Sequence, residues 1–218
     1  FVVQGPPGTG KTFVGSHVVS AILHDDPLAR ILVSAQSNSA TDNMLEAVEG
    51  TVSGTSERPL MLRHTSPEAR HKLSPTAARY VLDEQVVAVR RRIVDAPAPP
   101  GPLSAIRKQW RGLAKDQKLD TELHTRLPRA ANIVFATCIG AGAEVESLRE
   151  GPGFDWVIVE EAAHAWLSEI AVPLVQGDRW LLIGDHAQLP AHGAEEVERV
   201  FRSDVEDPFT TEATGHVP

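Results

Sequence analysis

The chain opens on the stretch FVVQGPPGTGKT, Phe1 to Thr12, in which a short apolar run leads into a glycine-rich turn. From Gly5 onward the residues follow the pattern G-x-x-x-x-G-K-[ST], whose glycines let backbone N–H groups turn inward around phosphate oxygens. In this pattern the side chain at Lys11 reaches the β- and γ-phosphates, and the hydroxyl at Thr12 binds Mg²⁺. We therefore predict a strand, a phosphate-binding loop and a helix that runs from Lys11 to about Leu23.

The positive end of this helix points at the same anion as the loop. The alternative is a glycine-rich turn with no ligand, and the position of the motif between a strand and a helix argues against it. The nucleotide-binding residues predicted from the loop are Gly5, Pro6, Pro7, Gly8, Thr9, Gly10, Lys11 and Thr12.

Apolar runs alternate with helical segments along the rest of the chain. Five runs are strand-like: Phe1–Gln4, Ile31–Ala35, Asn132–Thr137, Trp156–Val159 and Trp180–Ile183. Each is followed by a polar or glycine-bearing turn, which is typical of a parallel α/β sheet. Ligands of such sheets bind at the carboxyl ends of the strands, so these five ends are the predicted site.

Two adjacent carboxylates, Glu160 and Glu161, follow the run WVIV directly. A phosphate loop needs a second strand whose terminal carboxylate holds the magnesium and whose neighbour orients or deprotonates the attacking water. We predict these two roles for Glu160 and Glu161 in that order. The alternative is an acidic helix start stabilised by the helix dipole.

Other phosphate-loop classes fit less well. Lys11 and Glu160 stand 149 residues apart, whereas a compact AAA+ module has far less chain between them. A GTPase is disfavoured because the chain contains no Asn-Lys-x-Asp sequence for reading guanine.

With these features together, the chain resembles superfamily 1B helicases, in the branch that includes the nonsense-mediated-decay RNA helicase. The resemblance covers Phe1 to about Ala191 apart from an insertion, and it rests on five motifs in order. The segments similar to motifs I, Ia, Ic, II and III are GPPGTGKT, ILVSAQSNSATDNML, ANIVFATCIGAG, FDWVIVEEAAHA and LLIGDHAQLPA. The resemblance implies a RecA-like P-loop NTPase domain, the first of two such domains.

The resemblance also implies further site residues. By similarity, Gln188 senses the γ-phosphate and Asp185 supports the magnesium site. Ser37, Asn38 and Thr137 would touch the backbone of a nucleic acid, although Ser37, Asn38 and Asp42 are also good candidates for helix caps. The family usually has Asp where Glu160 stands, and we interpret the Glu-Glu pair as a subfamily variant. The upstream glutamine motif and motifs IV to VI do not occur, so we expect the chain to be a fragment.

Charge is distributed unevenly. The whole chain carries a net charge of −8, but residues 58–129 hold 15 of the 21 Lys and Arg residues and only 7 of the 29 acids. This segment therefore carries +8 and the remainder −16. The asymmetry indicates either a basic, nucleic-acid-binding surface or a solvated helical face.

We predict that residues 58–129 form a helical subdomain inserted into a RecA-like domain of residues 1–57 and 130–218. A first amphipathic helix should begin at Ser74 and extend to Ile93, the proline-rich stretch 96–102 should end it, and a second should begin near Ser104. The two would form an antiparallel hairpin with a basic polar face and tip. Its basic residues are Arg90, Arg91, Arg92, Arg107, Lys108 and Arg111.

These features predict an ATP-dependent nucleic-acid helicase or translocase that uses ATP and Mg²⁺. Its expected partners are a single strand of RNA or DNA and a second RecA-like domain of the same polypeptide. We expect no association with a membrane. A nucleic-acid clamp or remodelling scaffold without unwinding activity, and an inactive homologue, remain alternatives. The single cysteine, Cys138, suits a reducing compartment, and we expect the cytoplasm.

Overall fold

The computed structural model describes residues 1–53, 58–95, 101–115, 118–143, 153–185, 187 and 199. Its centre is a six-stranded sheet in the order β1-β6-β5-β2-β4-β3, in which every neighbouring pair runs parallel. The strands are β1 (Val2–Gln4), β2 (Ile31–Ala35), β3 (Met61–Arg63), β4 (Ile133–Thr137), β5 (Phe154–Glu160) and β6 (Gly177–Gly184). The predicted α/β class and the five predicted strands are confirmed.

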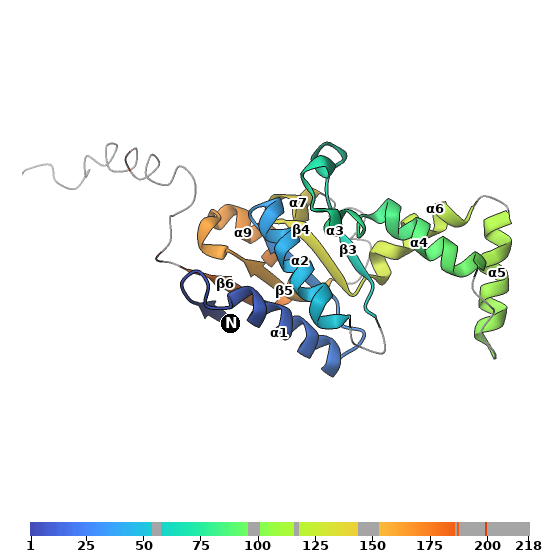
Figure 1. The fold of residues 1–218 in the computed structure, drawn as a ribbon, viewed down its shortest axis with the longest axis horizontal. Helices are drawn as coiled ribbons and strands as arrows, with labels where there is room; N and C mark the ends of the chain where they lie inside the picture. Colours follow the sequence, from blue (N-terminus) through green and yellow to red (C-terminus); the bar gives the residue numbers. More distant parts are fainter. Residues whose placement is uncertain are drawn as a thin grey trace, which may run out of the picture.

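Helices cover both faces of the sheet, and a helical arm projects from one side (Figure 1). One face carries α1 (Lys11–Asp25) and α2 (Asn38–Val52), and the other carries α7 (Cys138–Ala143) and α9 (Leu167–Leu174). The short elements are α3 (Pro75–Ala78), η1 (Pro67–Lys72) and η2 (Ala162–His164). Within the residues that the structure describes, no helix is both long and apolar enough to span a membrane.

Alternation along the strands builds one hydrophobic cluster on each face. In β2, Ile31 and Val33 pack with Met44 of α2 on one face. Leu32 points the other way and packs with Ile170 of α9. All five residues of β2 are buried, because side chains alternate between two faces that are both covered by helices. The carboxyl ends of all six strands meet at one edge, which becomes the candidate site.

The sixth strand, β3, was not predicted. It pairs with β4 in parallel, with Met61 opposite Ile133 and Arg63 opposite Phe135. The sequence-based boundary assigned it to the insertion at 58–129, whereas the structure places it at the edge of the sheet. Three residues carry no periodic signal, and no glycine-rich motif follows them as it does the equally short β1. An arginine within the buried strand also hides the apolar pattern.

The helical arm consists of α4 (Leu82–Asp95), α5 (Leu103–Lys115) and α6 (Leu119–Ala130). It surrounds a small hydrophobic cluster of its own, with Trp110 and Leu113 of α5 packed against the buried members. Those buried members are Val86, Leu119, Leu123 and Leu127. The arm therefore has a core separate from the two clusters of the sheet.

The single helix predicted from Ser74 to Ile93 is divided into α3 and α4. Ser74 begins α3 as expected, since its hydroxyl accepts a hydrogen bond from the Ala77 N–H at 3.1 Å. The helix is then interrupted because the Arg63 N–H donates to the Tyr80 carbonyl at 2.8 Å. This backbone bond ties the chain to β3, a tertiary constraint that helical periodicity does not reveal.

The predicted antiparallel hairpin also differs from the structure. α4 packs mainly against α6, which was not predicted, and α5 crosses the end of this pair (Figure 1). Pro128 lies inside α6, and a proline in a helical pattern usually indicates a break. Most of the predicted break itself, at 96–100, falls outside the described residues.

We expect Gly177→Ala to destabilise the fold by about 1–3 kcal/mol, because there is no room for a side chain where β6 starts beside β5. A Cβ at this position would lie 2.9 Å from the Phe154 carbonyl oxygen and 2.6 Å from Val157 Cγ2. The matched control is Gly50→Ala in α2, where a Cβ meets nothing within 4 Å. This change should stabilise the chain by about 0.5–1 kcal/mol through helix propensity.

Urea denaturation of both variants checks this prediction. Equal stability of Gly177→Ala and the wild-type chain would contradict the described approach of β6 to β5.

Candidate functional site

The loop from Gly5 to Thr12 joins the end of β1 to the start of α1. Gly8 and Gly10 have φ values of 76° and 86°, a backbone region that glycine adopts without strain. The loop is held to the next strand of the sheet by the Gly5 N–H, which donates to the Gly184 carbonyl at 3.2 Å. Within the loop, the Thr9 hydroxyl donates to the Pro6 carbonyl at 2.8 Å. These bonds fix the shape of the loop.

The ammonium group of Lys11 lies against this loop. Its Nζ donates to the Gly5 carbonyl at 2.7 Å and to the Pro6 carbonyl at 3.1 Å. Lys11 is also the first residue of α1, whose amino end carries the partial positive charge of the helix dipole. The loop therefore presents a full charge and a helix terminus to the same place, which suits a phosphate group.

Glu160 at the end of β5 is joined to this loop. The Thr12 hydroxyl donates to Glu160 Oε1 at 2.6 Å. Glu160 is only 4% exposed, and its other oxygen, Oε2, is buried without a hydrogen-bond partner among the described residues. Burial raises the pKa of Glu160 and the nearby charge of Glu161 adds to this, against the opposing effects of the Thr12 hydrogen bond and Lys11.

An unpartnered buried carboxylate oxygen is costly in a folded protein unless a cation binds it. Mg²⁺ is usually held by one or two protein oxygens together with phosphate oxygens and water. Across the described ranges, no group of three or more His, Cys, Asp or Glu side chains is placed to hold a metal by itself. Thr12 and Glu160 therefore fit a magnesium ion that arrives with phosphates.

Glu161 has a strained backbone. Its φ and ψ are 54° and 37°, and it is the one non-glycine residue with positive φ among the described residues. Such a conformation costs about 1–3 kcal/mol and is typical of functional sites. It turns the chain sharply after β5, and the Glu161 carbonyl accepts a hydrogen bond from the His164 N–H at 3.0 Å. The Glu161 side chain is exposed.

One cavity of about 420 Å³ connects these groups, a size within the usual range for small-molecule sites. Its lining residues are Pro7, Gly8, Gly10, Lys11, Thr12, Glu160, Glu161, His164, Gly184 and Asp185. The structure thus brings the loop, both glutamates and Asp185 together. Asp185 follows β6 and accepts a hydrogen bond from the Ala187 N–H at 3.0 Å. Gln188 lies outside the described residues.

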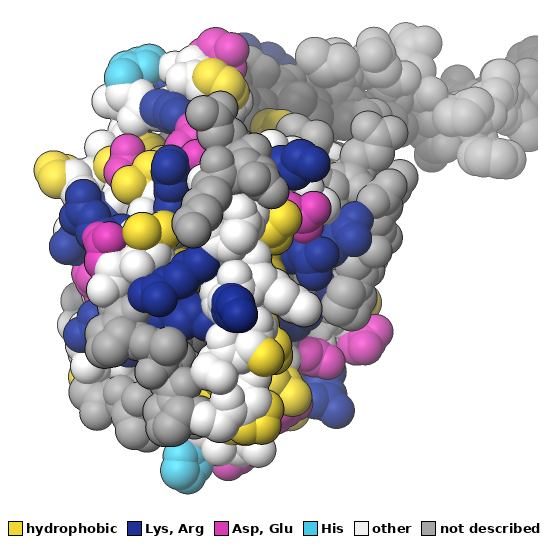
Figure 2. Space-filling model, turned by 90° about the vertical axis from the view of Figure 1, so that its right-hand side faces the viewer, with side chains coloured by type: hydrophobic (Ala, Val, Ile, Leu, Met, Phe, Trp, Pro, Cys, Tyr) yellow, Lys and Arg dark blue, Asp and Glu magenta, His cyan; other side chains and the backbone are white. Residues whose placement is uncertain are grey.

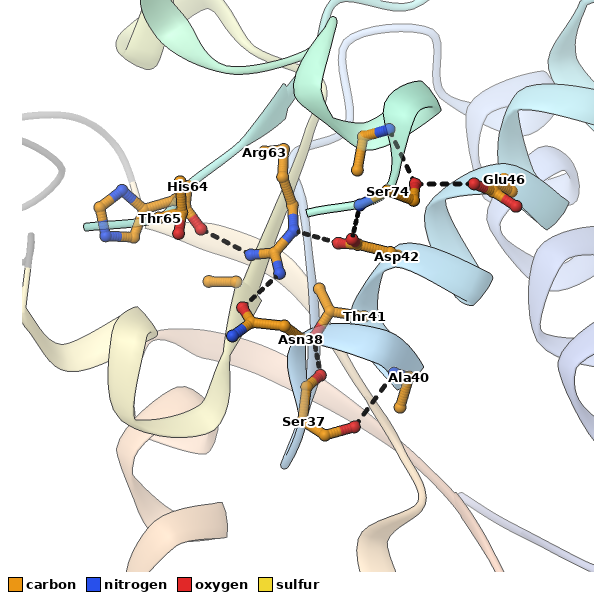
Figure 3. A network of polar contacts seen from close by, with 12 residues as sticks. Ser37, Asn38, Ala40, Thr41, Asp42, Glu46, Arg63, His64, Thr65 and Ser74 are labelled. Atoms are coloured by element: carbon orange, nitrogen blue, oxygen red, sulfur yellow. Dashed lines mark hydrogen bonds and ion pairs between the residues drawn. The ribbon is translucent and has the colours of Figure 1, made fainter. Parts of the chain in front are cut away.

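The polar residues predicted to contact nucleic acid lie at the ends of β2 and β4. These strands pair with Ala35 opposite Thr137, so their polar ends share one edge. Ser37 caps α2, its hydroxyl accepting from the Ala40 N–H at 3.1 Å, and Thr137 accepts from the Gly140 N–H at 3.1 Å. Asn38 begins α2 (Figure 3). Asp42, by contrast, does not cap its helix.

A buried ion pair that sequence reasoning missed lies behind this edge. Arg63 is 1% exposed, and its Nε donates to Asp42 Oδ1 at 2.7 Å (Figure 3). Burial lowers the pKa of Arg63, while the hydrogen bond and the charge of Asp42 oppose the shift. Asp42 Oδ2 accepts a second bond, from the Ser74 N–H at 2.7 Å. The signal in the sequence that could have revealed this ion pair was an arginine at the end of the apolar run LML.

Lys and Arg side chains gather on the face at the α5 end of the molecule (Figure 2). Within the helical arm, Arg91, Arg92 and Lys108 are exposed, as is Arg90, which pairs with Asp120 at 3.0 Å. The other two predicted members of the basic face are engaged with the end of α4. Arg107 and Arg111 donate to the Ile93 carbonyl, each at 3.2 Å from Nε.

Comparisons with known proteins agree with this arrangement. A family model described as an AAA domain matches residues 1–94 and 102–193. The match includes the long stretch between Lys11 and Glu160, so the spacing that argued against a compact AAA+ module is compatible with this family.

Three relatives cover most of this chain. Regulator of nonsense transcripts 1 of Dictyostelium discoideum is 27% identical over 86% of this chain and 14% of its own length. ATP-dependent helicase upf1 of Schizosaccharomyces pombe is 29% identical over 86% of this chain and 20% of its own length. DNA-binding protein SMUBP-2 of Mesocricetus auratus is 31% identical over 87% of this chain and 20% of its own length. These names confirm the predicted resemblance to superfamily 1B helicases, and the chain spans a fifth or less of the length of each of these relatives.

We expect Glu161→Gly to be more stable than Glu161→Ala by about 1 kcal/mol, because only a residue with a Cβ is strained at positive φ. Both changes remove the same carboxylate, so their difference isolates the backbone. Thermal or urea unfolding measures it. Equal stability of the two variants would show that the backbone at this position is not left-handed in solution.

Proposed function

The chain belongs to the AAA domain family, and on this basis we propose that it is the first motor domain of an ATP-dependent nucleic-acid helicase or translocase. The observation that carries the proposal is the link between the phosphate-type loop and the end of β5. There the Thr12 hydroxyl meets Glu160 Oε1 while Oε2 is left buried and unpartnered among the described residues. A phosphate-type loop beside a buried carboxylate with one unpaired oxygen suits a nucleoside triphosphate with its magnesium.

Each group at the cavity has a role in this proposal. The backbone of the loop and the Lys11 ammonium would bind the β- and γ-phosphates, and Thr12 and Glu160 would hold Mg²⁺. The bound ion would neutralise part of the phosphate charge. Glu161 is exposed to the cavity beside the buried Glu160, where it would orient or deprotonate the attacking water. Asp185 would support the magnesium site.

The same proposal assigns the nucleic acid to the edge formed by β2 and β4. Ser37, Asn38 and Thr137 would contact the backbone of a single strand, and the basic face of the helical arm would contribute further phosphate contacts. We propose the arm as the inserted subdomain, a second RecA-like domain as the partner of the motor, and the cytoplasm as its location. The single cysteine, Cys138, suits that reducing compartment.

We expect Lys11→Ala to weaken binding of MgATP about 10- to 100-fold, because the variant has no ammonium group to pair with the phosphates. Glu160→Gln keeps an acceptor for Thr12 and should mainly raise the magnesium concentration needed for binding. Isothermal calorimetry across a magnesium titration measures both effects. The control is Lys108→Ala, which removes an exposed lysine from the helical arm and should change neither.

Equal affinity of Lys11→Ala and the wild-type chain for MgATP would rule out this site. An unchanged magnesium dependence in Glu160→Gln would rule out the metal role of that carboxylate.

We expect joint replacement of Arg90, Arg91 and Arg92 by Gln to weaken binding of single strands and to flatten its salt dependence. The slope of log K against log salt should become shallower by about 0.7 for each phosphate that the variant no longer neutralises. Fluorescence anisotropy with labelled oligo-dT and oligo-U between about 50 and 200 mM salt measures the slope.

The control for this experiment is Arg179→Gln, a change to an exposed arginine of β6 away from the arm. A slope that stays the same in the triple variant would show that these arginines form only a solvated helical face.

A further inference from the structure

Arg63 is the last residue of β3, yet its side chain is completely buried, with 0% exposure. All three guanidinium nitrogens are engaged. Nε donates to Asp42 Oδ1 at 2.7 Å, Nη1 to the His64 carbonyl at 2.6 Å, and Nη2 to Asn38 Oδ1 at 2.8 Å (Figure 3). A buried charge in this setting is neutralised by Asp42 and cannot itself reach a ligand at the surface.

The contact with Arg63 decides how the Asn38 side chain is oriented. A guanidinium group has only donors, so Asn38 must turn its carbonyl oxygen toward Arg63. The amide nitrogen Nδ2 then lies on the side away from the guanidinium, as Figure 3 shows. Asn38 is half-buried and stands next to the exposed Ser37, and Nδ2 donates to no described residue. A donor of fixed direction is thus held at the edge of the sheet.

From this geometry we infer that Arg63 is a positioning residue for nucleic-acid binding. By holding Oδ1, it directs Asn38 Nδ2 to donate to a phosphate oxygen of the bound strand. Phosphate oxygens only accept hydrogen bonds, and the amino end of the 15-residue helix α2 lies at the same place. The inference rests on the proposed function, because it concerns the edge of the sheet at which the proposed motor would bind its nucleic-acid strand.

Arginine is required in this role because its planar fork reaches separate acceptors in fixed directions. Asp42 sits beside it on α2 and also accepts from the Ser74 N–H, so the carboxylate fixes the guanidinium between α2 and α3. A lysine has one nitrogen and cannot reproduce the three bonds to Asp42, His64 and Asn38 together. Arg63→Lys therefore keeps the buried charge but releases the Asn38 amide.

A double-mutant cycle tests the inference. Affinity of the chain for labelled oligo-U and oligo-dT is measured for Asn38→Ala, Arg63→Lys and the double variant, together with their melting temperatures. Loss of one charge-assisted bond lowers affinity about 10-fold, so each single change should have an effect of this order. The double variant should bind no more weakly than Asn38→Ala, although Arg63→Lys lowers the melting temperature in both backgrounds. Additive losses of affinity would overturn the inference.

A second pair of variants leaves Arg63 in place and can be measured even if Arg63→Lys does not fold. It tests the Asn38 Nδ2 donor, without which Arg63 would have no donor to position. Asn38→Asp keeps an acceptor for Arg63 and so keeps the melting temperature, but it removes the Nδ2 donor and should weaken binding by at least about 10-fold. The matched control, Asn43→Asp, adds the same charge to an exposed position of α2 and should weaken binding far less.

The outcomes separate this inference from the proposed function. If the chain binds strands but Asn38→Asp binds as well as Asn43→Asp, the inference is wrong and the function stands. If the wild-type chain binds neither oligonucleotide, both are wrong.

Discussion

One hydrogen bond, from the Thr12 hydroxyl to Glu160, connects two parts of the site that lie 148 residues apart in the chain. It joins the loop after β1 to the end of β5, although β6 lies between these two strands in the sheet. The bond is possible because all strands run parallel and their carboxyl ends meet at one edge. If β5 were reversed, Glu160 and Glu161 would lie at the opposite edge. The direction of the strands is therefore the constraint that makes a loop and two glutamates into one cavity.

Asp42 and Glu160 are both buried acids, but their carboxylate oxygens differ in how they are hydrogen-bonded. Asp42 is 3% exposed, and both of its oxygens accept hydrogen bonds, from Arg63 and from the Ser74 N–H. Glu160 is 4% exposed, but only one of its oxygens has a partner among the described residues. A fully paired buried carboxylate holds elements of the protein together, whereas an incompletely paired one retains capacity for a ligand. The pairing of the oxygens, rather than their burial, is therefore what distinguishes Glu160 from Asp42.

The sequence was sufficient for features that depend on local pattern. The phosphate-type loop, the five strands other than β3 and the caps at Ser37 and Ser74 follow from short-range chemistry, and the structure places them as predicted. Features set by contacts between distant residues were missed. β3 has only three residues and depends on pairing with β4, the break after α3 depends on a bond between Arg63 and Tyr80, and the proline in α6 obscured that helix. The Arg63–Asp42 pair could not be predicted because β3 itself was not recognised.

The separate core of the helical arm has a consequence for how the molecule unfolds. Among the described residues, Leu60 and Leu82 are the side chains that pack against both the arm's cluster and a cluster of the sheet. Regions that have their own core and share little packing with the rest open as distinct cooperative units, each with its own opening free energy. We therefore expect the arm to open as a unit of its own, with its amides exchanging with solvent while the sheet that holds Thr12 and Glu160 stays closed. In such a molecule, local opening of the arm would leave the bond between Thr12 and Glu160 undisturbed.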